Sequence, residues 1–119
     1  MEWKFTEDRP IWQQLSQQIA RQILIGVYPP GSKLPSVREL AAQAGVNPNT
    51  MQRALAQLEQ TGLAEANRTA GRLVTRDEGV IEAARRAEAQ GIIRRYLESM
   101  NELGYSPSDA VELLKEENQ

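Results

Sequence analysis

The fold is decided by the stretch SVRELAAQAGVNPNTMQRALAQL at residues 36–58, which predicts two short helices and a tight turn between them. Ser36 and Glu39 have the spacing of a capping box, in which each side chain bonds the other residue's backbone N–H at a helix start. Gly45 follows at the place where a left-handed residue ends a helix. We therefore expect the first of the two helices over residues 36–43.

The second helix of this stretch is predicted over residues 48–61. Asn47 suits the position of its cap, and Pro48 suits its first position, where the missing N–H would be unpaired anyway. Gly62 ends the pattern. Apolar residues recur at helical spacing and leave the opposite face polar. The apolar positions are Met51, Ala54, Leu55 and Leu58.

Further elements are predicted on both sides of these helices. Upstream, apolar residues at spacings of three and four predict a helix from Pro10 to about Gly26. The residues between it and Ser36 predict a loop, with room only for a bridging strand. Downstream, two short strands are expected at residues 63–66 and 73–75, joined by a hairpin tip.

The order of helix, helix, glycine turn, helix and β-hairpin is typical of a winged helix-turn-helix domain. After the hairpin, a long helix is predicted from about residue 77 to residue 103. A cap signal at Ser106 opens a last helix. The predicted fold class is α+β and mostly helical, with a DNA-binding domain at residues 1–76 and a two-helix segment at residues 77–119.

Composition excludes several classes of function. The 119 residues contain no cysteine and no histidine, so the usual zinc sites and the Ser-His and Cys-His catalytic arrangements are excluded. We expect no metal and no cofactor, and the sequence contains no phosphate-binding glycine motif. An enzyme is therefore disfavoured. Neither a signal-peptide core nor an apolar run near the roughly 18–20 residues of a membrane span is present, which predicts a cytoplasmic protein.

Charge is distributed unevenly along the chain. Residues 1–76 carry nine basic and six acidic residues, a net charge of +3, although the whole chain has a net charge of −2. Residues 77–119 carry five basic and ten acidic residues, a net charge of −5. The first part is thus suited to a polyanion and the second is not.

The helix at residues 48–61 is expected to enter the DNA major groove with its N-terminus first. Its exposed polar residues suit the edges of bases, because arginine pairs with guanine and asparagine or glutamine with adenine. The start of the preceding helix offers N–H groups to a phosphate, and basic residues of the hairpin suit the minor groove. The candidate DNA-binding residues are Ser36, Val37, Arg38, Asn49, Thr50, Gln52, Arg53, Arg68, Gly71 and Arg72.

Taken singly, these residues have simpler interpretations. Ser36 is first a structural cap, Gln52 and Arg53 suit any solvated helix face, and Trp3 and Trp12 suit packing. A winged helix that binds RNA or another protein would use the same scaffold without groove insertion. The prediction of DNA binding depends on the joint pattern of turn, caps, polar helix face and basic hairpin.

The sequence also resembles the GntR family of bacterial repressors. The resemblance lies in PIWQQL at residues 10–15, GVYPPGSKLPSVRELA at residues 26–41 and GVNPNTMQRAL at residues 45–55, followed by Leu58-Glu59 and Gly62-Leu63. It implies DNA contacts at Ser36, Arg38, Asn49, Thr50, Arg53 and the hairpin.

The hairpin departs from the family pattern. Arg68, Gly71 and Val74 match, whereas Thr69 replaces a glycine, Arg72 a threonine and Leu73 an aromatic residue. The DNA contact of the hairpin is therefore the least secure part of the resemblance.

The segment after Arg76 is too short for the effector-binding domain of most GntR regulators. The chain in this respect resembles the short YtrA-type subfamily, in which two helices form a dimerisation unit. Apolar residues along the long helix support this independently, because a two-helix hairpin cannot cover them alone. The alternative is that this helix folds back on the first domain. The candidate dimer-interface residues are Ile81, Ala84, Ile92, Tyr96, Leu97, Met100, Leu103, Val111 and Leu114.

The resulting prediction is a sequence-specific transcription regulator. A homodimer would bind a palindromic double-stranded operator, with half-sites ~34–36 Å apart, and act as a repressor, as is typical of the family. No convergent set of polar residues predicts a small-molecule effector site.

Overall fold

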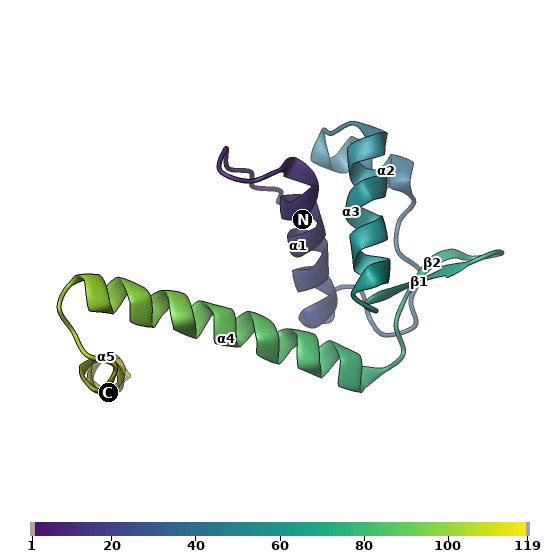
Figure 1. Ribbon diagram of the computed structural model, residues 1–119. Helices are drawn as coiled ribbons and strands as arrows, with labels where there is room; N and C mark the ends of the chain where they lie inside the picture. Colours follow the sequence, from purple (N-terminus) through teal and green to yellow (C-terminus); the bar gives the residue numbers. More distant parts are fainter. Residues whose placement is uncertain (1, 119) are drawn as a thin grey trace. The chain divides into compact units, whose positions relative to one another are not determined.

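The computed structural model describes residues 2–118 and contains five helices and one two-stranded sheet in that part of the chain (Figure 1). The helices are α1 (Ile11–Leu24), α2 (Val37–Ala44), α3 (Pro48–Gln60), α4 (Glu78–Glu102) and α5 (Pro107–Glu117). The strands are β1 (Ala64–Asn67) and β2 (Gly71–Val74). The chain forms two compact units that divide between Ala83 and Ala84. The prediction of a mostly helical α+β fold is confirmed.

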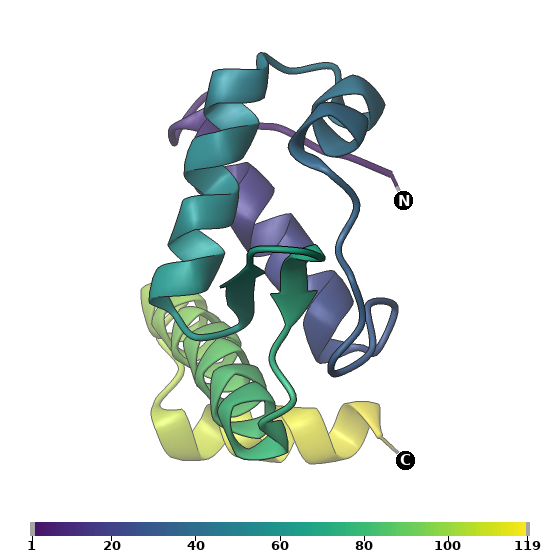
Figure 2. The same ribbon diagram turned by 90° about the vertical axis from the view of Figure 1, so that its right-hand side faces the viewer.

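The first unit has one apolar core, to which α1, α2, α3 and the sheet contribute. Figure 2 shows α1 crossing behind α3, with α2 set at an angle to α3 at its N-terminal end. The side chains at the centre of this core are almost fully buried. They are Leu15, Ile19, Ile23, Leu34, Leu40, Met51, Leu55, Leu58 and Val74.

The helix ends have the caps that the sequence predicts. The Ser36 hydroxyl accepts a hydrogen bond from Glu39 N at 3.1 Å, and the Glu39 carboxylate accepts one from Ser36 N at 3.2 Å. Gly45 has φ +69°, a left-handed conformation that glycine adopts at little cost. The Asn47 side chain accepts a hydrogen bond from Asn49 N at 2.8 Å. These local interactions fix the turn between α2 and α3.

The β-hairpin is antiparallel, and its register pairs Ala64 with Val74 and Asn67 with Gly71. The Asn67 side chain accepts hydrogen bonds from the backbone N–H groups of Thr69 and Ala70, and it thereby closes the tip. On the other edge, Lys33 forms an isolated bridge with Leu73, as predicted for a short bridging strand.

Residues 2–9 form an N-terminal arm that two glutamines of α1 hold against the helix. Gln14 is 2% exposed, and its side-chain amide bonds the backbone of Thr6 and of Arg9. Gln18 bonds both the N–H and the carbonyl of Lys4. Each glutamine amide thus accepts from a backbone N–H of the arm and donates to a backbone carbonyl, as the backbone of a neighbouring β-strand would.

The second unit consists of most of α4 and of α5, which crosses the end of α4 instead of running antiparallel to it (Figures 1 and 2). The Tyr96 hydroxyl donates a hydrogen bond to the Ala110 carbonyl at 2.6 Å, and Ala110 is fully buried. The hydroxyl of Ser106 and the carboxylate of Asp109 form a second capping box at the start of α5. No helix within residues 2–118 is long and apolar enough to cross a membrane.

Candidate nucleic-acid interface

The outer face of α3 carries the polar side chains that the sequence assigns to base contacts. Asn49, Gln52 and Arg53 are exposed and Thr50 is half-buried, while the opposite face of α3 lies in the core. Asn49 and Arg53 are one helical turn apart, so their side chains lie on the same face. The packing of α3 therefore leaves a polar ridge that begins at its first turn.

The start of α2 contributes a second group of candidate residues. The N–H groups of Val37 and Arg38 lie in the first turn of α2, where no intrahelical carbonyl faces them. The Arg38 side chain is exposed, and Val37 is half-buried. The Ser36 hydroxyl is occupied by the cap, so its structural role is observed directly. The backbone here is suited to an anion.

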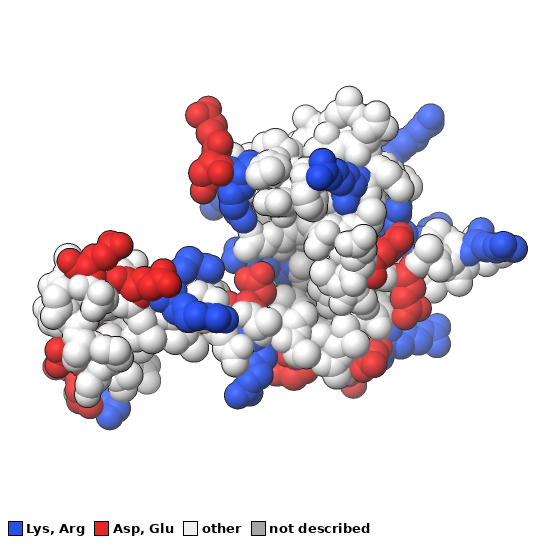
Figure 3. Space-filling view, viewed as in Figure 1, with Lys and Arg blue, Asp and Glu red and all other residues white. Residues whose placement is uncertain are grey.

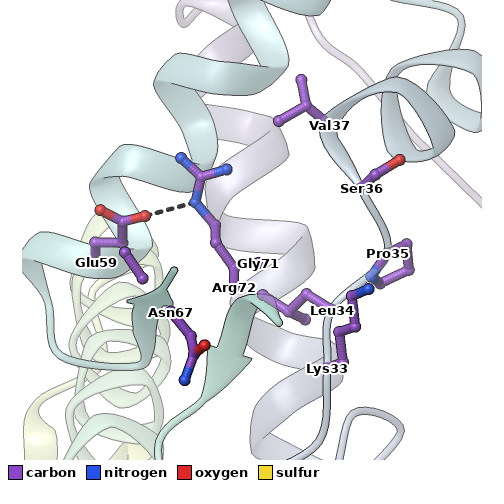
Figure 4. A pocket seen from close by; sticks show the side chains of 10 residues that line it. Lys33, Leu34, Pro35, Ser36, Val37, Glu59, Asn67, Gly71 and Arg72 are labelled. Carbon is purple, nitrogen blue, oxygen red and sulfur yellow. Dashed lines mark hydrogen bonds and ion pairs between the residues drawn. The ribbon is translucent and has the colours of Figure 1, made fainter. Parts of the chain in front are cut away.

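The three hairpin candidates lie in different surroundings. Arg68 is exposed at the tip, and Gly71 has φ +81° where β2 begins. Arg72 instead reaches to α3, where its Nε lies 2.5 Å from Glu59 Oε1 (Figure 4). The Arg72 side chain is 18% exposed. The replacement of the family's threonine by Arg72 thus ties the hairpin to α3 and leaves Arg68 as the basic residue of the tip.

A groove of about 400 Å³ separates the start of α2 from the hairpin. Figure 4 shows Ser36 and Val37 on one side of it and Arg72 on the other. Lys33 also lines it, and sequence reasoning missed this residue. The bridging strand expected before Ser36 could have indicated it, because pairing of Lys33 with Leu73 brings the Lys33 side chain close to Gly71.

The exposed basic side chains of this surface come from separate elements. Lys33 precedes α2, Arg38 lies on α2, Arg53 on α3 and Arg68 on the hairpin. Figure 3 shows basic side chains at the end of the hairpin. Among the described residues, no group of His, Cys, Asp and Glu could hold a metal ion. The arrangement of basic side chains is suited to binding the phosphates of a polyanion.

The candidate dimer-interface residues are unevenly exposed. Ile81 belongs to the first unit and is 6% exposed, so this chain already covers it. Ala84, Tyr96, Leu97 and Met100 are half-buried. Exposed apolar side chains remain in the second unit at Ile92, Leu103, Val111 and Leu114.

These elements together define a winged helix-turn-helix protein, in which α2 and α3 form the helix-turn-helix and β1–β2 the wing. The family model of bacterial regulatory proteins of the gntR family matches residues 12–74. An uncharacterized HTH-type transcriptional regulator of Bacillus subtilis, YhcF, is 31% identical over 97% of this chain and 95% of its own length. The chain therefore belongs to the GntR family, as its sequence resemblance predicted.

Solved structures and a second relative agree. A GntR family transcriptional regulator from Listeria monocytogenes is 35% identical and superposes with a TM-score of 0.86 over 94% of this chain and 98% of the other. The transcriptional repressor YtrA of Bacillus subtilis is 44% identical over 56% of this chain and 51% of its own length. The prediction of a GntR-family regulator of YtrA type is confirmed. The chain is a transcription regulator with a DNA-binding helix-turn-helix, and its relatives are not enzymes.

Proposed function

We propose that this protein is a cytoplasmic repressor that binds a two-fold-symmetric DNA operator as a homodimer. The observation that carries the proposal is the exposed polar face of α3, which lies in the same unit as the start of α2 and a basic hairpin tip. The relative YtrA, whose name states that it is a repressor, supports the direction of regulation.

Each α3 would enter a major groove with its N-terminus first. Asn49 and Gln52 would bind adenine and Arg53 guanine, with Thr50 beside them against a backbone or base edge. The N–H groups of Val37 and Arg38 and the Arg38 side chain would bind phosphates, which set the register of the protein on the duplex. The Ser36 N–H, which the sequence also assigned to a phosphate, already donates to Glu39.

The hairpin would reach the minor groove through Arg68, with Gly71 letting the backbone turn at the tip. Arg72 is already paired with Glu59, so it would bind a phosphate only by exchanging this carboxylate for it. In this proposal Arg68 makes the main contact of the hairpin and Arg72 a secondary one.

Residues 1–76 would form the DNA-binding domain and residues 77–119 the dimerisation segment. Within residues 84–118, Ala110 alone is buried, so this unit has little core of its own. Ile92 and Leu114 are about half exposed and Leu103 is 75% exposed. A second copy would cover these side chains, because burying apolar area against a partner is favourable by roughly 25 cal/mol per Å². The proposed interface consists of Ala84, Ile92, Tyr96, Leu97, Met100, Leu103, Val111 and Leu114. Ile81, which the sequence also assigned to the interface, is left out because this chain already buries it.

The dimer is tested by a charge placed on an exposed apolar position. Leu103→Asp should give a monomer in sedimentation equilibrium, because a carboxylate would be buried without a partner. Leu103 has little contact within its own chain, so the substitution should leave the fold intact. Asn101→Asp, which adds the same charge at a neighbouring exposed residue, is the matched control. A Leu103→Asp protein that still sediments as a dimer would place the interface elsewhere.

The DNA-binding proposal is tested by selecting sites from a random pool of duplexes. The selected duplex is then titrated by fluorescence anisotropy at two salt concentrations. A two-fold-symmetric site bound about 10³-fold more tightly than random duplex is the expected result. If all duplexes bind equally and weakly, with only the salt-dependent phosphate contribution, the protein does not read sequence. Tighter binding of RNA than of DNA would favour the alternative winged-helix function.

A further inference from the structure

Trp12, in the first turn of α1, touches the proposed base-reading helix. The guanidinium carbon of Arg53 lies over the Trp12 ring, 4.3 Å from the ring centroid. This is within the roughly 6 Å at which a cation is attracted to the face of an indole. Trp12 is half-buried and Arg53 is exposed. The contact therefore connects a partly buried side chain of α1 with the solvent-facing side of α3.

The stack restricts a side chain that would otherwise be mobile. An exposed arginine samples many rotamers, whereas a guanidinium held over the face of an indole has fewer. Stacking occupies the faces of the guanidinium and leaves its edges free, and the N–H donors that pair with guanine lie on those edges. In the described part of the chain, Arg53 has no hydrogen bond or ion pair that would compete for these donors.

We propose that Trp12 is a positioning residue that fixes the orientation in which Arg53 reads its base pair. This inference rests on the proposed function, because it assigns Trp12 to sequence recognition through Arg53. Trp12 itself need not touch DNA. Its removal should therefore weaken discrimination at one base-pair position and leave the phosphate contribution to binding unchanged.

The test compares four variants on the selected duplex and on duplexes changed at one position at a time. Arg53→Ala should lose roughly 5- to 150-fold in affinity for the selected site and lose its preference at one position in each half-site. Trp12→Leu should lose about 2- to 5-fold, with relaxed preference at that same position. Trp12→Phe, which keeps an aromatic face, should lose less. The double variant should match Arg53→Ala alone, because a positioning residue has no effect once its target is removed.

Two measurements separate positioning from structural support. Each variant is unfolded in urea, and Gln13→Leu serves as an exposed control next to Trp12. In NMR spectra of the free protein, the Arg53 side-chain protons should be shifted by the ring current of Trp12 and return to ordinary values in Trp12→Leu.

The outcomes decide between this inference and the proposed function. If the unsubstituted protein selects no sequence, the proposed function fails and the inference fails with it. If the protein selects a site but Trp12→Leu keeps its full preference, or weakens all positions equally, the inference alone is wrong. Losses of Trp12→Leu and Arg53→Ala that simply add in the double variant would also overturn it.

Discussion

Gln14→Leu should detach the N-terminal arm from the first unit. Gln14 is 2% exposed, and both the oxygen and the nitrogen of its amide are hydrogen-bonded. Its Oε1 accepts from Thr6 N at 2.8 Å, while the Thr6 hydroxyl, 3.3 Å away, donates its one proton to the Asp8 carboxylate. Its Nε2 donates to Thr6 O at 2.9 Å and to Arg9 O at 2.8 Å. Leucine has a similar volume but can make none of these bonds.

The expected loss follows from the three short bonds. A net contribution of about 0.5–1.5 kcal/mol for each bond gives a decrease of about 1.5–4.5 kcal/mol in the free energy of unfolding. The loss should not exceed this range, because the arm is terminal and can move into water, where its backbone groups are solvated again. Gln18→Leu should cost less, since the two bonds that it breaks are exposed to water.

Urea unfolding followed by circular dichroism measures the free energy, and tryptic cleavage after Lys4 reports release of the arm. Gln13→Leu, at an exposed neighbouring position, is the control and should change stability by less than about 0.5 kcal/mol. If Gln14→Leu stays within that margin and Lys4 is cleaved no faster, the buried amide does not hold the arm as argued.

The other predictions concern the hairpin and two glycines. Glu59→Gln should release Arg72, tighten binding to random duplex and steepen its salt dependence by about one phosphate contact. Glu65→Gln removes the same charge from an exposed site, and an equal steepening there would show that only net charge matters. Gly45→Ala should lower the free energy of unfolding by about 1–2 kcal/mol, because φ is +69° and alanine disfavours this left-handed conformation. No atom lies within 4 Å of the added Cβ, so a steric clash should not add to this cost. Gly91→Ala, inside α4, should instead raise it by about 0.5–1 kcal/mol; shifts of the same sign in thermal or urea unfolding would contradict this contrast.

Local sequence signals were sufficient for the helices and their ends. The capping box at Ser36, the left-handed Gly45 and the start of α3 at Asn47-Pro48 are confirmed, because each depends on residues within four positions of one another. Observed helix ends differ from the predicted ones by one or two residues, which is the usual uncertainty at frayed ends. The family was also readable from the sequence, since its motifs occur in order within residues 10–63.

Contacts between distant residues were not readable in this way. The long-helix pattern predicted an apolar stripe, yet the apolar side chains of α4 are distributed around the helix. Tyr96 is bonded to α5, while Ile92 and Leu103 remain exposed. The physical reason is that α5 contacts α4 locally, where Tyr96 bonds Ala110, so the exposure of each α4 side chain depends on where α5 crosses and not on the helical period.

The sequence by itself thus determined the order of the elements, the helix-turn-helix and the polar face of α3, because capping and amphipathic spacing act along the chain. How individual side chains of that interface are held depends on contacts between elements. The tertiary structure paired Arg72 with Glu59, stacked Arg53 on Trp12 and brought Lys33 beside the hairpin. Each of these contacts joins two elements whose side chains meet only after the apolar core has packed, and neither composition nor periodicity specifies that meeting.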